Sequence, residues 1–395
     1  MAQAAPPLSL DDPQLYAQGF PHPHFDLIRA NGPVHWSAGN NPFFAVVGYD
    51  TAVTVLKDPG IYSSGLGGIS IDDPAPEIWP AFSAMLPVLD PPEHMALRQH
   101  LFPALKPGAI AGLRADLERR CNELLTQACA RGECDFVDAI AAEIPIAAFG
   151  ALMGLTRAEL VPLRVLSDEV ITHGANDSTD AIARLFDYFE RLVDERRARP
   201  RDDYLTLLAR VETGDRPMSR IERNGMLLQI VIGGLETTRS AMAGTLVELD
   251  RRREQWLQLR DHPGLIDNAV EESLRHVSPV NYVRRTTRVD TVLGDTTIPA
   301  GARVVVWLGA ANRDPARFTA PHDFDIGRNN ARQHLALGAG EHFCMGAALA
   351  RLQLATFWRV FTQRVAEFRV ISLDRIPSVQ QNAVRCLRVE LRTAP

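Results

Sequence analysis

A cysteine near the end of the chain lies in a glycine-rich loop that leads directly into an apolar, alanine-rich run. The segment reads Leu337-Gly338-Ala339-Gly340-Glu341-His342-Phe343-Cys344-Met345-Gly346. A thiolate is a nucleophile and a metal ligand, and the free N–H groups at a helix N-terminus lower the pKa of a thiol. Gly338 and Gly340 can adopt backbone angles closed to other residues and admit a flat ligand, and Gly346 leaves the sulfur uncrowded. The sequence therefore predicts that Cys344 is an anionic ligand; the alternative is a small buried residue in a turn.

A second pattern is a glutamate and an arginine three residues apart. Glu272 and Arg275 lie in the run Ile266 to Val277, which has helical periodicity, so both side chains share one helix face. A solvated surface pair is the default interpretation of this spacing. A buried pair would instead be costly to break, because one missing partner leaves the other charge uncompensated.

A third pattern interrupts the long helical run from Ser219 to Arg252. The residues Gly233-Gly234-Leu235-Glu236-Thr237-Thr238 are poor choices for a helix interior, because glycine weakens a helix by roughly 1 kcal/mol and threonine can bond back to the chain. The pattern predicts that the helix opens locally here. The alternative is a tight contact between two helices.

Four basic side chains could bind the carboxylates of a ligand through charge-assisted hydrogen bonds. His94 and Arg98 are four residues apart at an expected helix start, His342 precedes the cysteine by two residues, and Arg285 opens the run Arg285-Thr286-Thr287-Arg288. Each of them alone could be a solvated surface charge. Arg284 competes with Arg285 for the same role.

Taken in order, these motifs resemble those of the cytochrome P-450 superfamily, in which Phe-Gly-x-Gly-x-His-x-Cys-x-Gly is the usual haem-binding signature. This chain departs from that signature by placing Leu337 at the aromatic position. The resemblance extends from the early strands to the tail. It implies haem b, with Cys344 as the axial thiolate ligand of the iron. It also implies a set of cofactor-binding residues: His94, Arg98, Arg285 and His342 at the propionates, and Gly338, Gly340, Gly346, Gly233 and Gly234.

The same resemblance implies roles for the remaining motifs. Thr237 would donate a hydrogen bond to bound dioxygen and Glu236 would assist proton delivery. Glu272 and Arg275 would form a buried structural triad with Arg328 from the segment Pro321 to Arg328. The implied activity is a monooxygenase that inserts one oxygen atom from O2 into an organic substrate. No nicotinamide or flavin motif is fused to the chain, so electrons should come from a separate ferredoxin-type donor and its reductase.

Other readings remain open. A protein of the same fold could catalyse carbon–carbon coupling, desaturation or peroxide-driven oxidation. A non-catalytic haem gas sensor could share the cysteine ligand, although a sensor has no use for a proton relay such as Glu236 and Thr237.

Apolar segments are expected to bound the substrate pocket, which favours a lipophilic substrate. The candidate lining residues are Ile232, Leu235, Val280, Asn281, Tyr282, Val283 and Val384. Two further segments over the haem, 60–89 and 166–183, carry the acids Asp72, Asp73, Glu77, Asp168, Glu169, Asp177 and Asp180, with His173 as the only potentially basic group. A carboxylate substrate would meet these acids without a cationic anchor, so we expect a neutral or basic substrate. The alternative is that the acids simply face solvent.

The elements that must position these residues are mainly helical. Helical periodicity covers Asp50 to Leu56, Ala111 to Cys129, Asp138 to Met153, Arg157 to Ile171, Asp180 to Arg199, Asp203 to Thr213, Ser219 to Arg252, Ile266 to Val277 and Ala347 to Phe361. Strands are expected at Pro33 to Trp36, Phe43 to Val47, Val292 to Leu293, Arg303 to Leu308 and within Phe368 to Leu391. The prediction is an α+β fold that is mainly α, with a minor β lobe from the parts 32–49, 280–310 and 368–392.

Length and charge agree with a large enzyme in a single two-lobed domain, residues 1–395, because no Gly/Ser-rich or Pro-rich linker interrupts the chain. The formal net charge of -6 gives no reason to expect nucleic acid or an anionic membrane as a partner. No apolar run approaches the roughly twenty residues of a membrane span. The five cysteines show no pairing or zinc spacing, which suits a reducing compartment. We therefore expect a cytoplasmic protein, and a monomer.

Overall fold

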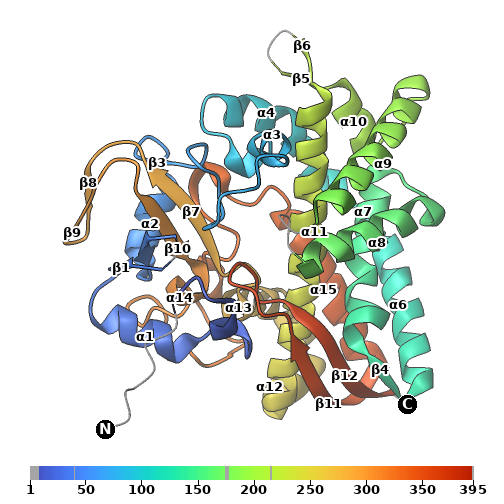
Figure 1. Cartoon of the computed structure of the whole chain (residues 1–395). Coiled ribbons are helices and arrows are strands. Elements are labelled where there is room, and N and C mark those ends of the chain that lie inside the picture. Colours follow the sequence, from blue (N-terminus) through green and yellow to red (C-terminus); the bar gives the residue numbers. More distant parts are fainter. Residues whose placement is uncertain (1–8, 40, 174–177, 214–215, 394–395) are drawn as a thin grey trace.

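The computed structural model describes residues 9–39, 41–173, 178–213 and 216–393. It divides into a part rich in strands and a larger helical part, and the long helix α11 (Arg220–Arg251) runs between them (Figure 1). The first part contains α1 (His22–Ala30), β1 (Val34–Ser37), β2 (Phe43–Val46), α2 (Tyr49–Lys57) and β3 (Tyr62–Ser63).

The chain then forms a series of helices. These are α3 (Trp79–Ser83), α4 (Glu93–Leu101), α5 (Pro107–Ile110), α6 (Leu113–Arg131), α7 (Glu143–Met153), α8 (Arg157–His173), α9 (Thr179–Ala198) and α10 (Tyr204–Arg210), with the short strand β4 (Glu133–Asp135) after α6. A π-helical turn, Val137–Ala141, precedes α7. The hairpin of β5 (Glu212–Thr213) and β6 (Arg216–Pro217) leads to α11.

The last third of the chain returns to mixed structure. It comprises α12 (Arg253–Asp261), α13 (Ile266–Val277), β7 (Tyr282–Thr287), β8 (Thr291–Leu293), β9 (Thr296–Ile298), β10 (Arg303–Trp307), α14 (Leu308–Ala311), α15 (Ala347–Arg364), β11 (Val365–Arg375) and β12 (Val384–Thr393).

The main sheet has the strand order β1-β2-β10-β7-β3. Strand β10 pairs in parallel with β2 and antiparallel with β7, so strands from both ends of the chain share one sheet. A second sheet has the order β11-β12-β4 and joins the tail of the chain to the end of α6. The predicted fold class, mainly α with a minor β part, is confirmed.

Local signals explain why α11 begins where it does. Ser219 accepts a hydrogen bond from the Glu222 N–H at 3.3 Å, and the Glu222 side chain accepts one from the Ser219 N–H at 2.6 Å. This capping box satisfies two N–H groups that a helix start otherwise leaves unpaired. Glu222 also binds Arg216, and this hydrogen bond, which outweighs the effect of partial burial, lowers the pKa of Glu222 to about 2.

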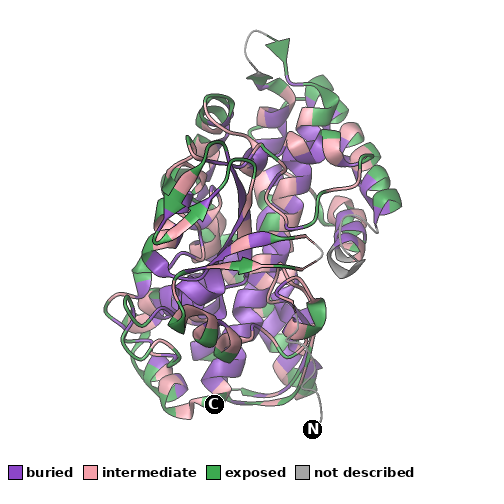
Figure 2. Ribbon diagram, turned by 60° about the vertical axis from the view of Figure 1, so that its left-hand side comes forward, coloured by how far each residue is buried: buried purple, intermediate pink, exposed green. Residues whose placement is uncertain are grey.

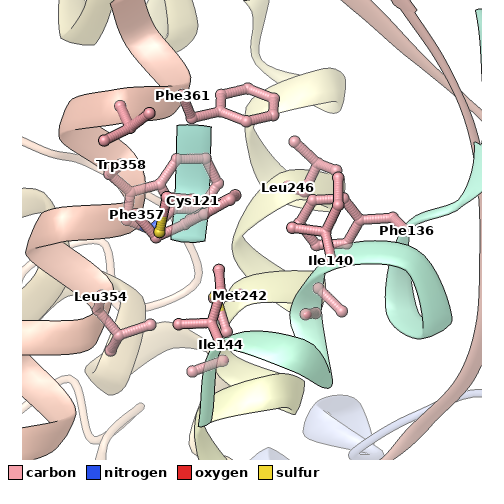
Figure 3. Packing of buried hydrophobic residues seen from close by; sticks show 14 of the residues in the cluster. Cys121, Phe136, Ile140, Ile144, Met242, Leu246, Leu354, Phe357, Trp358 and Phe361 are labelled. Atoms are coloured by element: carbon pink, nitrogen blue, oxygen red, sulfur yellow. The ribbon is translucent and has the colours of Figure 1, made fainter. Parts of the chain in front are cut away.

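The core of the helical part lies where α6, α7, α11 and α15 meet. Met242 and Leu246 from α11 pack against Cys121 from α6 and against aromatic side chains from α15 (Figure 3). Buried residues follow α11 through the interior, whereas exposed residues lie on the outer helices and hairpins (Figure 2). The position of α15, and with it the loop that precedes it, is therefore fixed by a large apolar core.

Two expectations about elements were wrong in detail, and one strand within the predicted β part 280–310 was not named separately. The helix expected to reach Thr213 ends at Arg210, because Glu212 and Thr213 pair with Arg216 and Pro217 as a hairpin. Leu308 belongs to α14 and not to the preceding strand. The sequence did not indicate strand β7, because its two arginines interrupt the apolar pattern of a segment whose side chains are nearly all buried.

No helix in the described ranges combines the length and the apolar character that crossing a membrane requires.

Candidate functional site

The cysteine loop has the tight backbone that its glycines predict. Gly338 and Gly340 have φ angles of 73° and 68°, in the left-handed region that favours glycine. A side chain at Gly340 would come within 2.6 Å of the Leu56 carbonyl oxygen at the end of α2. The Cys344 N–H donates to the Leu337 carbonyl oxygen at 2.8 Å, and the Cys344 carbonyl oxygen accepts from Ala347 N–H at 3.2 Å as α15 begins. The sulfur is thus held directly before the helix.

Leu337, the departure from the aromatic residue, packs into the same apolar core that Cys344 borders. Gly346 matters less than expected for room at the sulfur, because a Cβ there would lie 3.9 Å from Cys344 Sγ, an ordinary contact.

Burial governs the acidity of the Cys344 thiol. Burial raises the pKa of Cys344, and this outweighs the hydrogen bond from the Gly346 N–H and the charges of Arg98 and Arg351, which lower it. The helix N-terminus by itself thus does not offset the effect of burial, and the anionic state of Cys344 stays a prediction. A bound metal cation would supply the missing stabilisation, because coordination deprotonates a thiol outright.

The glycine pair of α11 creates room within a buried helix. Gly233 is exposed although it lies mid-helix, and a Cβ at Gly233 or Gly234 would meet nothing within 4 Å. This excludes a tight helix contact as the reason for these glycines. The predicted local opening is not seen either: α11 is continuous, and the Thr237 hydroxyl donates to the Gly233 carbonyl oxygen at 2.7 Å.

Glu236 is buried and faces charged and polar neighbours on its own helix. Its Oε1 accepts a hydrogen bond from the Ser240 hydroxyl at 2.8 Å, and its Oε2 pairs with Arg239. The structure therefore places Glu236 and Thr237 on adjacent positions of one turn, with the carboxylate held toward Arg239 and Ser240.

The structure brings the four predicted basic side chains together. The His94 and His342 rings lie 4.2 Å apart, and the charges of Arg98 and Arg285 act on both. Burial, followed by these neighbouring charges, lowers the pKa of His94 to about 4 and that of His342 to about 2. Burial also lowers the pKa of Arg285 to about 10.

Within the described ranges, no carboxylate forms an ion pair with any of these four side chains. Both ring nitrogens of His94 and Nδ1 of His342 are buried without a hydrogen-bond partner there. Asp90 acts on His94 and Arg285 only from a distance; its oxygens bind the N–H groups of Ser64 and Gly65 and the Arg288 guanidinium. A buried guanidinium such as Arg285 without a counter-charge is unfavourable unless an anion joins it.

The neighbouring arginines of β7 have different roles, because successive side chains of a strand point to opposite faces. Arg284 binds Asp73 at 2.6 Å and the Ser70 carbonyl oxygen at 3.1 Å, and so anchors the loop that follows β3. Arg285 makes no such pair and joins the basic cluster. The geometry thus favours Arg285 over Arg284 as a partner for a ligand carboxylate, because Arg284 is already paired.

The glutamate–arginine pair of α13 is buried and has a third member. Arg275 donates to Glu272 from Nε and Nη2 at 2.7 Å each, and Arg328 donates from Nε to both Glu272 oxygens at 3.1 Å. The side chains of Glu272 and Arg275 have no exposed surface. The structure therefore places Glu272, Arg275 and Arg328 in one buried triad, which also binds backbone groups of the segment 319–325.

Sequence analysis missed a second ionic cluster on the same helix. Glu271 accepts from Arg351 Nε at 2.7 Å and from Arg351 Nη2 at 3.0 Å, and its Oε2 lies 3.2 Å from His334 Nε2. Burial raises the pKa of Glu271, but the bonds from His334 and Arg351 outweigh it and lower the pKa to about 2. In the sequence, the only indication of this cluster was a second glutamate, Glu271, directly before Glu272.

Part of the predicted substrate lining is not supported. Tyr282 packs against Trp307, with ring centroids 5.2 Å apart, in a core cluster on the N-terminal side of the sheet. Asn281 is fully buried and donates to the Val379 carbonyl oxygen at 2.9 Å. Val384 lies inside the large helical core. The burial of these three residues against neighbouring elements does not favour them as lining residues, and their role stays a prediction.

The remaining lining candidates are better placed. Ile232, Val280 and Val283 are partly exposed, and Leu235 belongs to the apolar cluster that also contains Met345, next to the cysteine. These residues come from α11 and from β7 with the turn before it.

Comparison with known proteins identifies the class to which this fold and site belong. The family profile "Cytochrome P450" matches residues 250–385. A linalool 8-monooxygenase of Pseudomonas putida is 31% identical over 382 residues, covering 93% of this chain and 94% of that protein. A steroid C26-monooxygenase of Mycobacterium tuberculosis is 32% identical over 380 residues, covering 94% and 93%. The solved structure of a cytochrome P450-153 from Novosphingobium aromaticivorans superposes with a TM-score of 0.89 at 29% identity, covering 97% and 99% of the two chains.

This chain therefore belongs to the cytochrome P450 family. The predicted enzyme class is confirmed, since its relatives are named monooxygenases.

The residues of the site fit the haem that this family implies. A propionate-bearing porphyrin supplies the two negative charges that the basic cluster of His94, Arg98, Arg285 and His342 lacks. Its iron supplies the cation that the buried Cys344 sulfur lacks. The fit thus depends on buried polar groups without partners and not on the loop sequence alone.

Proposed function

We propose that this protein is a haem-thiolate monooxygenase that inserts one atom of dioxygen into a lipophilic, neutral or basic organic substrate. The observation that carries the proposal is the basic cluster around the buried His94 and Arg285, which pairs with no carboxylate among the described residues, next to a glycine loop that holds a partly buried cysteine. When bound, haem supplies the redox chemistry that activates dioxygen.

The protein's own contribution begins with holding that cofactor. Cys344 Sγ is the proposed iron ligand, and Arg98 keeps the loop in place by donating to the Phe343 carbonyl oxygen at 2.8 Å. His94, Arg98, Arg285 and His342 would bind the propionates. Gly233 and Gly234 leave open space beside α11, where a side chain would otherwise project.

Proton delivery is the proposed task of Glu236 and Thr237. The Thr237 hydroxyl donates a hydrogen bond to the Gly233 carbonyl oxygen. A rotation about χ1 would point the hydroxyl instead into the open space beside Gly233. The Ser240 hydroxyl, bound to Glu236 Oε1, is a further proton-bearing atom on the same helix face. The Thr237 hydroxyl is thus the proposed proton donor to a ligand bound in the open space beside Gly233.

The charge preference for substrate depends on Arg284. Asp73 binds Arg284 at 2.6 Å and Arg303 at 2.7 Å, so the cation that could best anchor a substrate carboxylate is already paired. Asp72, Glu77 and Asp180 are exposed, as the alternative of solvent-facing acids expects. Asp177 lies outside the described residues, as do the side chains of Asp168 and His173.

Two relatives act on compounds of the proposed kind, since their names specify linalool and a steroid, which are neutral and largely hydrocarbon. We further propose that the electrons come from a ferredoxin-type protein and a separate reductase.

The proposal is tested by turnover under 18O2 with a surrogate ferredoxin and reductase, using terpenoid and polycyclic compounds that change the haem spin state. One 18O atom in the product would support a monooxygenase. An unlabelled desaturated or coupled product, activity only with peroxide, or ligand binding without turnover would each contradict it.

The substrate class is tested by spectral titration of matched pairs, each a neutral compound and its carboxylic acid of similar size. Tighter binding of the neutral member supports the charge argument, and tighter binding of the acid overturns it.

A further inference from the structure

A cavity of about 630 Å3 opens in the main sheet near the point where β2 and β10 begin, and the proposed reaction makes no use of it. It is lined by Trp36 and Phe44 from β1 and β2, by the turn 299–302, and by Arg284 and Arg303 from β7 and β10. Small-molecule sites have volumes of about 300–1,000 Å3, so this cavity is large enough to hold an organic ligand.

One wall of the cavity is aromatic and held in place by strand pairing. Trp36 and Phe44 are direct partners in the register of β1 with β2, and their ring centroids lie 4.8 Å apart in an edge contact. Trp36 is nevertheless 57% exposed, so much of its indole ring is uncovered. Pro42 and Pro299 add two rigid apolar rings. A flat hydrocarbon ring could pack on this wall in an offset or edge-to-face arrangement.

The other wall carries the two arginines, which project from one face of the sheet. Arg303 is opposite Thr286, and Arg284 is opposite Val305, in the antiparallel register of β10 with β7. Direct partners and alternate residues of a strand share a face. Arg285 therefore points to the opposite face, where the basic cluster of the proposed haem site lies. The cavity is thus separate from that cluster.

The arginine wall has one more positive charge than its own carboxylate can balance. Asp73 accepts hydrogen bonds from Arg284 Nη1 at 2.6 Å and from Arg303 Nη2 at 2.7 Å, so one carboxylate serves two guanidinium groups. Burial lowers the pKa of Arg284 although Asp73 acts against it. Asp72 is exposed to solvent and binds Asn41, so its charge is largely screened. Arg303 Nη1 donates to no acceptor among the described residues.

We propose that this cavity is a second ligand site, which binds a small aromatic carboxylate. Its ring would pack on Trp36, and its carboxylate would accept hydrogen bonds from Arg303 Nη1. A hydrogen bond between charged groups is about twice as strong as a neutral one, so the acid is favoured over a neutral compound of the same shape. Because the arginine wall faces away from the basic cluster, binding here leaves the haem spectrum unchanged. The site does not depend on the proposed reaction.

The experiment is a calorimetric titration of the haem-loaded protein with naphthalene carboxylate and with its neutral carboxamide. The acid should bind roughly 10-fold or more tightly than the amide, because only the acid carries the charge that Arg303 lacks. Binding should quench indole fluorescence without a change in the haem absorption bands. Cyclohexane carboxylate, which has the charge but no aromatic ring, should bind more weakly than the aromatic acid.

Single variants then assign the two walls. Arg303→Gln and Trp36→Ala should each weaken binding of the acid by roughly 10-fold, whereas Trp36→Phe should keep most of the affinity. Arg385→Gln, at a half-exposed arginine of β12 outside the cavity, is the matched control and should bind like the parent. Arg303→Gln also removes a partner of Asp73, but Trp36 is mostly exposed, so Trp36→Ala remains decisive if the arginine variant does not fold.

Equal affinity for the acid and the amide would overturn the proposal, as would an affinity for the acid that neither Arg303→Gln nor Trp36→Ala reduces. Binding of the acid that always shifts the haem bands would place it in the haem pocket and would contradict a separate site. No heat of binding at millimolar acid would contradict it as well.

Discussion

Replacing Arg285 by Gln should make the haem-free protein more stable while weakening its hold on haem. The Arg285 side chain is buried in the basic cluster, and burial lowers its pKa from 12.5 to about 10. A pKa difference of one unit corresponds to about 1.4 kcal/mol, so keeping this guanidinium charged costs on the order of 3 kcal/mol at neutral pH. Glutamine carries no charge to bury, so the variant avoids part of this cost and the free energy of unfolding of the haem-free protein should rise.

The same substitution should weaken haem binding. A hydrogen bond to a charged group contributes about 1.5–3 kcal/mol, so the variant should release haem roughly 10- to 100-fold more readily. Urea unfolding of the haem-free protein measures the first effect, and haem transfer to apomyoglobin measures the second. Arg284→Gln, on the opposite face of the same strand, is the matched control and should leave haem affinity near that of the parent.

A haem-free Arg285 variant that is less stable than the parent, together with unchanged haem release, would refute the assignment of this cluster to the propionates.

Three further outcomes are expected. Glu272→Gln should lower the free energy of unfolding by about 3–5 kcal/mol, because it leaves two buried guanidinium groups without a charge partner, whereas Glu123→Gln in an exposed pair should cost under about 1 kcal/mol in urea unfolding. Thr237→Ala should keep haem content and ligand binding but divert electrons to hydrogen peroxide, which a peroxide assay per electron consumed will show; equal coupling in variant and parent would contradict the proton role. Burial and the Arg313 charge lower the pKa of His22 and His276 well below 6.5. The native state therefore binds fewer protons than the unfolded state, so the free energy of unfolding should fall as the pH drops below 6.5. Replacing both histidines by Gln should make the urea midpoint less dependent on pH between pH 7.5 and 5.5.

The sequence predicted the features whose signals are local. The periodic runs of α9, α11 and α13 have bounds that differ from the prediction by at most one residue, and α11 also begins with a capping box. The loop glycines could be predicted because only their positive φ angles permit the tight turn before Cys344.

Features that depend on distant partners could not be predicted. Nothing local shows that Glu271 meets Arg351, because the pair forms only when α13 packs on α15. The face on which Tyr282 lies depends on the register of β7 with β10, which the sequence of β7 alone does not specify. The raised pKa of the Cys344 thiol has the same origin, since burial by the surrounding fold outweighs the local helix terminus.

The central claim is that Cys344 is the thiolate ligand of a haem iron, and the most direct measurement is the carbon-monoxide difference spectrum of the reduced protein. The parent should show the red-shifted band that marks a thiolate ligand, and Cys344→His should lose that band while haem remains bound to the basic cluster. Cys121→Ser, at a buried cysteine of the helical core, is the control and should keep the band. A red-shifted band that persists in Cys344→His with haem bound would contradict the account.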